Sequence, residues 1–422
     1  MEKVIDVTRC SLKDFESNGN FNLEDRASHF YNYIEWRNTL KHNTYRVDSL
    51  TGSGATMKVV DPYTLKIKNV ITFVSNDYLG FSHHPKILEA CINAIEDYGA
   101  GAGASPLIGG QLNLHDLLEQ KIANFFEKED AITFTAGFAA NSGTLSALLG
   151  KEDIAILDMY VHASVVDGCC NTNKKFFLHN NMESLESILK VTSKSYRNRI
   201  IVVDGVYSQD GDIAALDQVC SLAKQYNAYV MVDDAHGIGI FGEKGRGVLE
   251  EYDLLSKVDF ITGTFSKTFG SVGGYLVANK YFTRYLKYYS RANIFSAAAT
   301  PQSAAAVIKG LELLHEEPQW QAKIRNNMSY FNEQLTTLKI NHGNTASAIF
   351  PIMICDEDKT NEAAKILFDN GIYVNPITYP AVVRKQSRLR MSVLATHSKE
   401  DLDTTLNVLE HVVKKLNIKR NE

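Results

Sequence analysis

The sequence lacks long apolar runs, and it lacks a strong excess of charge of either sign. No window reaches the roughly 18 consecutive apolar residues that a membrane-spanning helix needs, so we expect membrane contact to be peripheral at most. The 44 Lys and Arg residues nearly balance the 49 Asp and Glu residues, which gives a net charge of −5. An overall attraction to nucleic acid is therefore not expected.

Cysteine is scarce and scattered, and the N-terminus lacks an apolar segment. The six cysteines form no CxxC pair and no cluster with histidine at metal-ligand spacing, so we expect free thiols and no metal site. Charged residues such as Asp6, Arg9 and Lys13 interrupt the first twenty positions, so we expect no signal peptide and a cytoplasmic protein. With 45% hydrophobic and 22% charged residues, the 422-residue chain has the composition of a large globular protein.

The chain divides into three expected regions. Residues 1–70 are polar and turn-rich and are expected to form an N-terminal arm. Residues 71–300 are expected to form a large domain, because short apolar runs alternate there with helical patterns. Residues 301–422 are expected to form a small C-terminal α+β domain, which begins with an alanine-rich helical pattern and ends in a helix from about Lys399 to Leu416.

The order of these patterns predicts an α/β fold. Short apolar or β-branched runs predict strands at residues 131–134, 154–157, 200–203, 229–232, 260–262 and 349–354. Apolar residues spaced three and four positions apart predict helices at residues 85–99, 114–125, 182–191, 216–226 and 304–314. Strands separated by crossover helices favour a mainly parallel sheet with helices on both faces.

Two charged residues follow neighbouring strands. Asp233 ends the run Tyr229-Val230-Met231-Val232, and Lys267 follows the next strand within Gly263-Thr264-Phe265-Ser266-Lys267. The carboxyl ends of parallel strands are where such sheets bind ligands. In pyridoxal phosphate chemistry a lysine forms a Schiff base with the cofactor, and a carboxylate keeps its pyridine nitrogen protonated. The order and placement of Asp233 and Lys267 therefore indicate a pyridoxal phosphate enzyme, with hydroxyls of Thr264 and Ser266 available to the phosphate.

Longer motifs carry a resemblance to a known family. They are DDAHGIGIFGEKGRG (233–247), GTFSKTFGSVGGYL (263–276), IFSAAATP (294–301), NPITYPAV (375–382) and RMSVLATHSKE (390–400). With these motifs the chain resembles the α-oxoamine synthase family of fold-type I pyridoxal phosphate enzymes, and within it is most similar to the serine palmitoyltransferase branch. The resemblance runs from about Val74 to about Thr405.

The resemblance implies roles around the cofactor ring. It assigns Lys267 to the Schiff base, Asp233 to the pyridine nitrogen, and His236 and Ser208 to the phenolic oxygen of the ring. His162 falls where the family has a histidine stacked on the cofactor, although a lone histidine is about as often a structural core residue. The backbone N–H groups of Gly137 and Phe138, which begin a predicted helix, are expected to bind phosphate, unless the pair forms an ordinary strand-to-helix turn.

Further positions concern the substrate and the partner subunit. Arg390 matches the family arginine that binds the amino-acid carboxylate, with a solvated arginine as the alternative. Asn76 and Tyr78 match a segment that lines the substrate pocket. Ser296 falls where a neighbouring subunit reaches the phosphate, so the resemblance implies a homodimer. Pro106 departs from the family pattern, because many members have arginine there, and this departure bears on substrate identity.

The resemblance implies a transferase that joins a small amino acid to an acyl thioester with loss of carbon dioxide. Serine, or an acidic analogue such as cysteate, with a long-chain acyl group is the leading expectation, and would place the enzyme in sphingolipid or sulfonolipid biosynthesis. The alternative is an 8-amino-7-oxononanoate synthase that uses alanine and a pimeloyl thioester. A plain aminotransferase and a catalytically silent subunit are further alternatives. The sequence leaves open whether coenzyme A or a carrier protein delivers the acyl group.

Overall fold

The computed structural model describes residues 5–16 and 21–421 and divides the chain into two compact units. The larger unit is the continuous segment Asn76–Arg325, and the smaller unit combines residues up to Ser75 with residues from Asn326 onward. The division into three domains at residues 1–70, 71–300 and 301–422 stays a prediction. The smaller unit includes residues of both the expected arm and the expected C-terminal domain.

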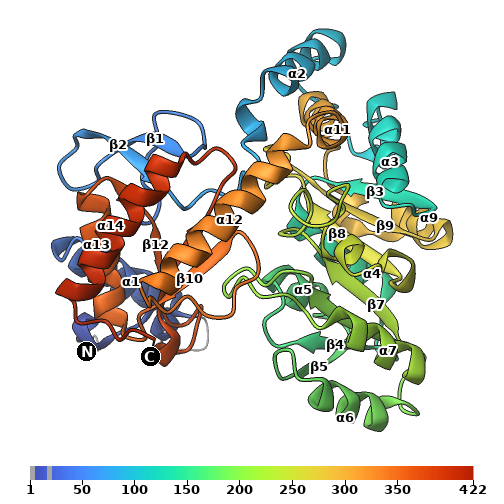
Figure 1. Cartoon of the computed structure of the whole chain (residues 1–422). Coiled ribbons are helices and arrows are strands. Elements are labelled where there is room, and N and C mark those ends of the chain that lie inside the picture. Colours follow the sequence, from blue (N-terminus) through green and yellow to red (C-terminus); the bar gives the residue numbers. More distant parts are fainter. Residues whose placement is uncertain (1–4, 17–20, 422) are drawn as a thin grey trace. The chain divides into compact units, whose positions relative to one another are not determined.

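A seven-stranded sheet forms the centre of the larger unit (Figure 1). Its spatial order is β3-β9-β8-β7-β6-β4-β5. The strand bounds are β3 (Asp130–Phe134), β4 (Ile154–Asp158), β5 (Asn173–Phe177), β6 (Arg199–Asp204), β7 (Tyr229–Asp233), β8 (Phe260–Thr264) and β9 (Gly274–Ala278). The mainly parallel α/β sheet that we predicted is confirmed, and β9 departs from it by pairing antiparallel with both β3 and β8.

Helices connect the strands and cover the sheet. They are α4 (Gly137–Leu148), α5 (Ala163–Gly168), α6 (Met182–Thr192), α7 (Leu216–Tyr226), α8 (Val248–Glu251), α9 (Lys280–Tyr289) and α10 (Arg291–Ile294). Every residue of β4, β6, β8 and β9 is buried, so both faces of the sheet are covered there. This burial explains why these strands read as nearly continuous apolar runs in the sequence. The predicted helices at 182–191 and 216–226 correspond to α6 and α7.

Three more helices pack together at one side of this unit. They are α2 (Pro85–Tyr98), α3 (Asn113–Phe125) and α11 (Pro301–Glu316), and α11 packs against both others. Pro85 occupies the first turn of α2, and Gly99 ends it with φ of 84°. The long helix α12 (Gln319–Thr337) follows and contains the boundary between the units.

The smaller unit contains two three-stranded sheets. One joins β1 (Thr56–Val60), β2 (Ile67–Thr72) and β11 (Ile372–Tyr373), and the other joins β10 (Ile349–Met353), β13 (Arg388–Ser392) and β12 (Asn375–Ile377). Its helices are α1 (Leu23–Thr39), α13 (Glu357–Asp369) and α14 (Lys399–Lys415). The expected arm therefore contains a helix and a β-hairpin. We did not predict either element, because the polar residues of this segment hide the apolar pattern.

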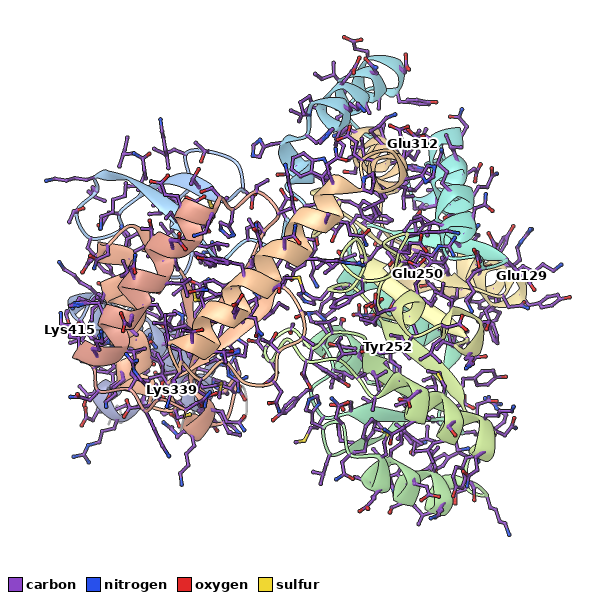
Figure 2. The ribbon with its side chains drawn as sticks, in the orientation of Figure 1. Glu129, Glu250, Tyr252, Glu312, Lys339 and Lys415 are labelled. Carbon is purple, nitrogen blue, oxygen red and sulfur yellow. The ribbon has the colours of Figure 1, made fainter. Side chains whose placement is uncertain are left out.

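A loop after β7 is held closed by carboxylates. Glu250, labelled in Figure 2, accepts a hydrogen bond from the backbone N–H of Arg246 at 2.9 Å, and Glu251 accepts one from Gly242 at 2.8 Å. Both acceptors belong to α8, so this helix fixes the far end of the loop that begins at Asp233. Among the described residues no helix is long and apolar enough to cross a membrane. All six cysteines are free thiols.

Candidate active site

A pocket of about 260 Å³ opens at the carboxyl ends of the central strands. The ends of β6, β7 and β8 each contribute a residue, namely Asp204, Asp233 and Thr264. Its other lining residues are Ala136, Gly137, Phe138, Asn141, His162, Val206, Ser208, Ala235, His236, Gly263, Ser266 and Lys267. The structure thus brings together nine predicted site residues, Asp233 among them, at the edge where parallel sheets bind ligands.

Asp233 is fixed in the pocket by two donors. The side-chain amide of Asn141 donates to Asp233 Oδ2 at 2.5 Å, and the backbone N–H of Ala235 donates to Oδ1 at 3.1 Å. Asn141 is itself held, because Thr262 Oγ1 donates to Asn141 Oδ1 at 2.7 Å. Asp233 is only 7% exposed, so these bonds act in a largely dry environment. The carboxylate is therefore presented to the pocket in one orientation.

Small and hydroxylated residues surround the start of α4. Ala136 occupies the N-cap position of α4, and its methyl side chain cannot accept a hydrogen bond from the first N–H groups of the helix. A Cβ on Gly137 would lie 2.7 Å from Thr264 Cβ and 2.9 Å from Thr264 Oγ1. The Thr264 hydroxyl lies 2.8 Å from Ser266 Oγ. Backbone donors and two hydroxyls thus meet at one end of the pocket, an arrangement suited to an anion.

His162 lies where α5 begins. Its Nδ1 is 2.7 Å from Ser164 Oγ, and its backbone N–H donates to Asp204 Oδ1 at 3.3 Å. Burial lowers the pKa of His162, although the charge of Asp233 acts in the opposite direction. Burial, reinforced by the charge of Asp233, raises the pKa of Asp204 well above its ordinary value. These directions favour a neutral imidazole at His162 and a protonated carboxyl at Asp204.

His236 is linked to the predicted substrate segment. The Tyr78 hydroxyl lies 2.7 Å from His236 Nδ1 and 3.3 Å from Asn76 Oδ1. The rings of Tyr78 and His236 meet edge to face, with centroids 6.0 Å apart. The structure therefore joins Asn76 and Tyr78 to the pocket through His236.

Other predicted residues lie elsewhere. Ser296 lines a separate small cavity next to Pro106 and His115. Arg390 belongs to β13 in the smaller unit, where its guanidinium donates to Ser392 Oγ at 3.0 Å. The roles expected for Ser296 and Arg390 stay predictions.

Sequence reasoning missed Asn141 and Asp204. Asn141 lies one helical turn after Gly137, so its position on the pocket side of α4 follows from the helix repeat. Asp204 ends a fully buried strand, and Asp233 likewise is the last residue of its strand. The signal for Asp204 was therefore present in the sequence, whereas the bond from Asn141 to Asp233 depends on tertiary contact.

The residues of this pocket fit pyridoxal phosphate. Lys267 supplies an amine, Asp233 an oriented carboxylate, and the start of α4 an anion site. The crowding at Gly137 is itself informative, because any side chain there would displace Thr264 from the edge of the anion site. The donor set thus matches the cofactor's amine-reactive, basic and phosphate groups.

Comparisons with known proteins agree with this geometry. Residues 68–409 match the family described as aminotransferase class I and II. An 8-amino-7-oxononanoate synthase from Bacillus pumilus is 40% identical over 391 residues, covering 90% of this chain and 100% of that protein. Another from Alkaliphilus oremlandii is 39% identical over 353 residues, covering 83% of this chain and 89% of that protein. A solved serine palmitoyltransferase from Sphingomonas wittichii has a TM-score of 0.87 and 30% identity, covering 94% of this chain and 100% of that chain.

The fold and these relatives together define a pyridoxal phosphate-dependent acyltransferase. The chain belongs to the aminotransferase class I and II family, and within that family it is a homologue of the α-oxoamine synthases. The resemblance noted from the motifs is therefore confirmed. The relatives named 8-amino-7-oxononanoate synthase support the alternative reading of the sequence more strongly than the serine reading.

Proposed function

We propose that this enzyme condenses a small α-amino acid with an acyl thioester, releasing carbon dioxide and a thiol, and that alanine and a pimeloyl thioester are its substrates. The observation that carries the proposal is the convergence of Lys267, Asp233 and the start of α4 on one pocket. The choice of alanine and pimeloyl groups rests on relatives of about 40% identity.

The proposed roles of the chain's own residues follow from their positions. Lys267 Nζ holds the cofactor and takes the proton from the amino acid's α-carbon. Asp233, oriented by Asn141, holds a proton at the pyridine nitrogen. When bound, pyridoxal phosphate supplies an electron-withdrawing ring that stabilises negative charge at the α-carbon. His162 would stack on that ring, and a neutral imidazole, which its lowered pKa favours, would avoid a competing charge beside Asp233.

The remaining residues bind and orient. The N–H groups of Gly137 and Phe138 and the hydroxyls of Thr264 and Ser266 hold the phosphate. Ser208 and His236 donate to the phenolic oxygen of the cofactor, and the contact of Tyr78 with His236 fixes that imidazole. Arg390 binds the carboxylate of the amino acid through a planar two-pronged donor.

Serine with a long-chain acyl group is the second candidate. It is favoured by the 30% identical serine palmitoyltransferase structure that spans 94% of this chain. An assignment to sphingolipid or sulfonolipid biosynthesis would require this reading. Pro106 stands where many family members carry arginine, and it bears on the choice because the resemblance places that position near the substrate.

The deciding experiment is a substrate matrix. Alanine, serine, cysteate and glycine are each combined with pimeloyl and palmitoyl thioesters of coenzyme A and of carrier protein, and thiol and carbon dioxide release are followed. The proposal predicts turnover with alanine and a pimeloyl thioester. Turnover with serine or cysteate and the palmitoyl thioester alone would support the second candidate. Formation of the pyridoxamine form of the cofactor without thiol release would indicate an aminotransferase instead.

Cofactor attachment is tested separately. Borohydride reduction followed by peptide mass spectrometry is expected to find the cofactor on Lys267, and label on another lysine would refute that assignment. A homodimer with Ser296 at the partner's phosphate and a cytoplasmic location complete the proposal. Sedimentation of the holoenzyme tests the dimer. Cofactor titration of the wild type and of Ser296→Ala tests the shared site.

A further inference from the structure

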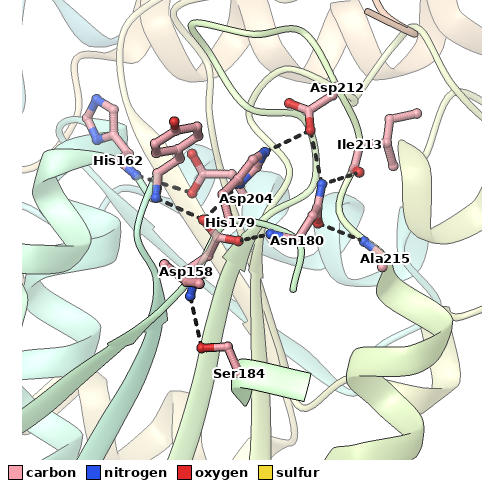
Figure 3. A network of polar contacts seen from close by, with 11 residues as sticks. Asp158, His162, His179, Asn180, Ser184, Asp204, Asp212, Ile213 and Ala215 are labelled. Atoms are coloured by element: carbon pink, nitrogen blue, oxygen red, sulfur yellow. Dashed lines mark hydrogen bonds and ion pairs between the residues drawn. The ribbon is translucent and has the colours of Figure 1, made fainter. Parts of the chain in front are cut away.

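His179 lies between two carboxylates outside the pocket. It follows β5, and its Nδ1 is 3.0 Å from Asp158 Oδ1 while its Nε2 is 2.8 Å from Asp212 Oδ2 (Figure 3). Asp158 is the last residue of β4 and is fully buried, and Asp212 belongs to the loop that follows β6. Both ring nitrogens face acceptors, so both carry hydrogens and the imidazole is a cation.

The same carboxylates also anchor backbone. Asp158 Oδ1 accepts from the N–H of Tyr160 at 2.8 Å, and Asp158 Oδ2 accepts from the N–H of Asn180 at 2.9 Å. The side chain of Asn180 donates to Asp212 Oδ2 at 3.0 Å and accepts from the backbone N–H of Ala215 at 3.2 Å. His179 and Asn180 thus bridge the end of β4 to the loop of residues 205–215 (Figure 3).

Charge and ring contacts support the cationic state. Burial acts to lower the pKa of His179, but the hydrogen bonds and charges of Asp158 and Asp212 outweigh it and raise the pKa to about 9. Tyr160 stacks on the imidazole with centroids 4.3 Å apart, and Tyr207 meets it edge-on at 4.4 Å. The groups that face His179 are therefore two carboxylates and two tyrosine rings.

Both bridged segments carry residues of the pocket. The segment after Asp158 leads to His162, whose backbone N–H donates to Asp204 Oδ1 (Figure 3). The other segment carries Ser208, and the N–H of Tyr207 donates to the carbonyl of Asp212 at 3.0 Å. A shift of Asp212 is therefore transmitted directly to the backbone beside Ser208.

We propose that His179 is a positioning residue of the active site, which as a cation ties Asp158 to Asp212 and so holds His162 and Ser208 in place around the cofactor. This inference rests on the proposed function, because the cofactor contacts of His162 and Ser208 are assigned there. A residue that only stabilised the fold would have no effect on cofactor binding beyond its effect on stability, whereas a charged clamp links cofactor affinity to its own titration.

The first measurement follows histidine protonation by NMR of histidine-labelled holoenzyme. The wild type is expected to show one imidazole that titrates near pH 9, and this signal should disappear in His179→Gln. In Asp212→Asn the same signal should titrate at lower pH, because one of the two acceptors loses its charge. A missing signal near pH 9, or an unchanged titration in Asp212→Asn, would overturn the charged clamp whatever the enzyme's substrate.

The second measurement is the dissociation constant of pyridoxal phosphate as a function of pH, followed by cofactor absorbance. We expect His179→Gln to weaken binding at neutral pH by about tenfold or more, the size of effect typical for loss of a bond to a charged group. Wild-type affinity should fall as pH rises through about 9, and in Asp212→Asn the fall should move to lower pH together with the NMR titration.

The matched control is His84→Gln. His84 is also buried and pairs with a carboxylate, with Nε2 3.2 Å from Glu317 Oε2, but it lies beside α2 and not at the pocket. This variant should keep the wild-type affinity and pH curve. The positioning role is refuted if His179→Gln has wild-type affinity for pyridoxal phosphate. It is also refuted if the pH dependence of that affinity is the same in Asp212→Asn as in the wild type. If His179→Gln does not fold, the NMR titration and the affinity curve of Asp212→Asn decide the positioning role. A wild-type enzyme whose reduced cofactor is not attached to Lys267 would instead show that the proposed function is wrong.

Discussion

Replacing Asn141 by alanine tests what the orientation of Asp233 contributes, and it also removes the bond that Asn141 donates to Ser164 Oγ at 3.0 Å. The substitution removes the donor that lies 2.5 Å from Asp233 Oδ2 and leaves the hydroxyl of Thr262 without its acceptor. Asn141 and Asp233 are 2% and 7% exposed, so the bond between them is largely shielded from bulk water. A hydrogen bond to a charged group contributes about 1.5–3 kcal/mol, so kcat/KM should fall by about 10- to 150-fold.

The assay measures kcat/KM, cofactor absorbance and thermal stability on the same samples. We expect the alanine variant to retain cofactor on Lys267, because the amine and the phosphate site are untouched. Thr262→Val is the matched control, since it removes the donor on the far side of Asn141 without touching Asp233. Its effect on kcat/KM should be smaller than that of the alanine variant. Wild-type kcat/KM in Asn141→Ala, with a lowered melting temperature only, would show that Asn141 acts through the fold.

Three further outcomes follow from the same structure. Gly137→Ala should weaken cofactor binding, measured by absorbance titration, because its Cβ would lie 2.7 Å from the side chain of Thr264. Asp233→Asn should abolish most turnover, whereas Asp234→Asn should keep it, because burial raises the pKa of Asp234 well above its ordinary value and so favours its neutral carboxyl. Burial lowers the pKa of His397 from 6.5 to about 4, so the free energy of unfolding should fall by ~3 kcal/mol as pH drops through that range, and His397→Gln should flatten the curve in chemical unfolding.

Each of these outcomes has a control or a contrary result. Gly101→Ala adds a Cβ in open space and should leave cofactor binding unchanged. Equal losses in Asp233→Asn and Asp234→Asn would mean that both carboxyls act through the loop. His397 is neutral in the folded protein, and its pKa is lower there than in the unfolded chain. Acid therefore protonates the unfolded chain first, and the free energy of unfolding falls as pH falls. Stability that rises as pH falls below 6 would contradict the assignment.

The sequence was sufficient for the elements around the pocket because their signals are local. Strands such as β4 and β6 are buried on both faces, so their apolar runs stand out from the polar turns around them. Asp233 and Lys267 each follow such a run, and their meeting at one sheet edge follows from parallel pairing of β7 and β8. Motif spacing was therefore enough to predict that Asp233 and Lys267 line one pocket.

Features that depend on contacts between distant segments were not predictable in this way. Strand β9 is as apolar as its neighbours, and only its pairing with β3 and β8 shows that it runs antiparallel. The bond from Asn141 to Asp233 joins a helix to a strand 92 positions away. The sequence did not predict the hairpin of β1 and β2, because exposed polar residues alternate with the buried ones in both strands and resemble the composition of a loop.

The discontinuous smaller unit has a consequence for synthesis on the ribosome. Strand β2 pairs in parallel with β11, with Ile71 opposite Ile372, so a strand made early waits for a partner made near the end. Residues Asn76–Arg325 form a continuous unit and are available to fold during that interval. The pocket residues on β6, β7 and β8 are therefore all synthesised before Arg390. A nascent chain long enough to expose Arg325 outside the ribosome, and too short to expose Arg390, should bind pyridoxal phosphate through Lys267 while lacking the side chain proposed to bind the amino acid.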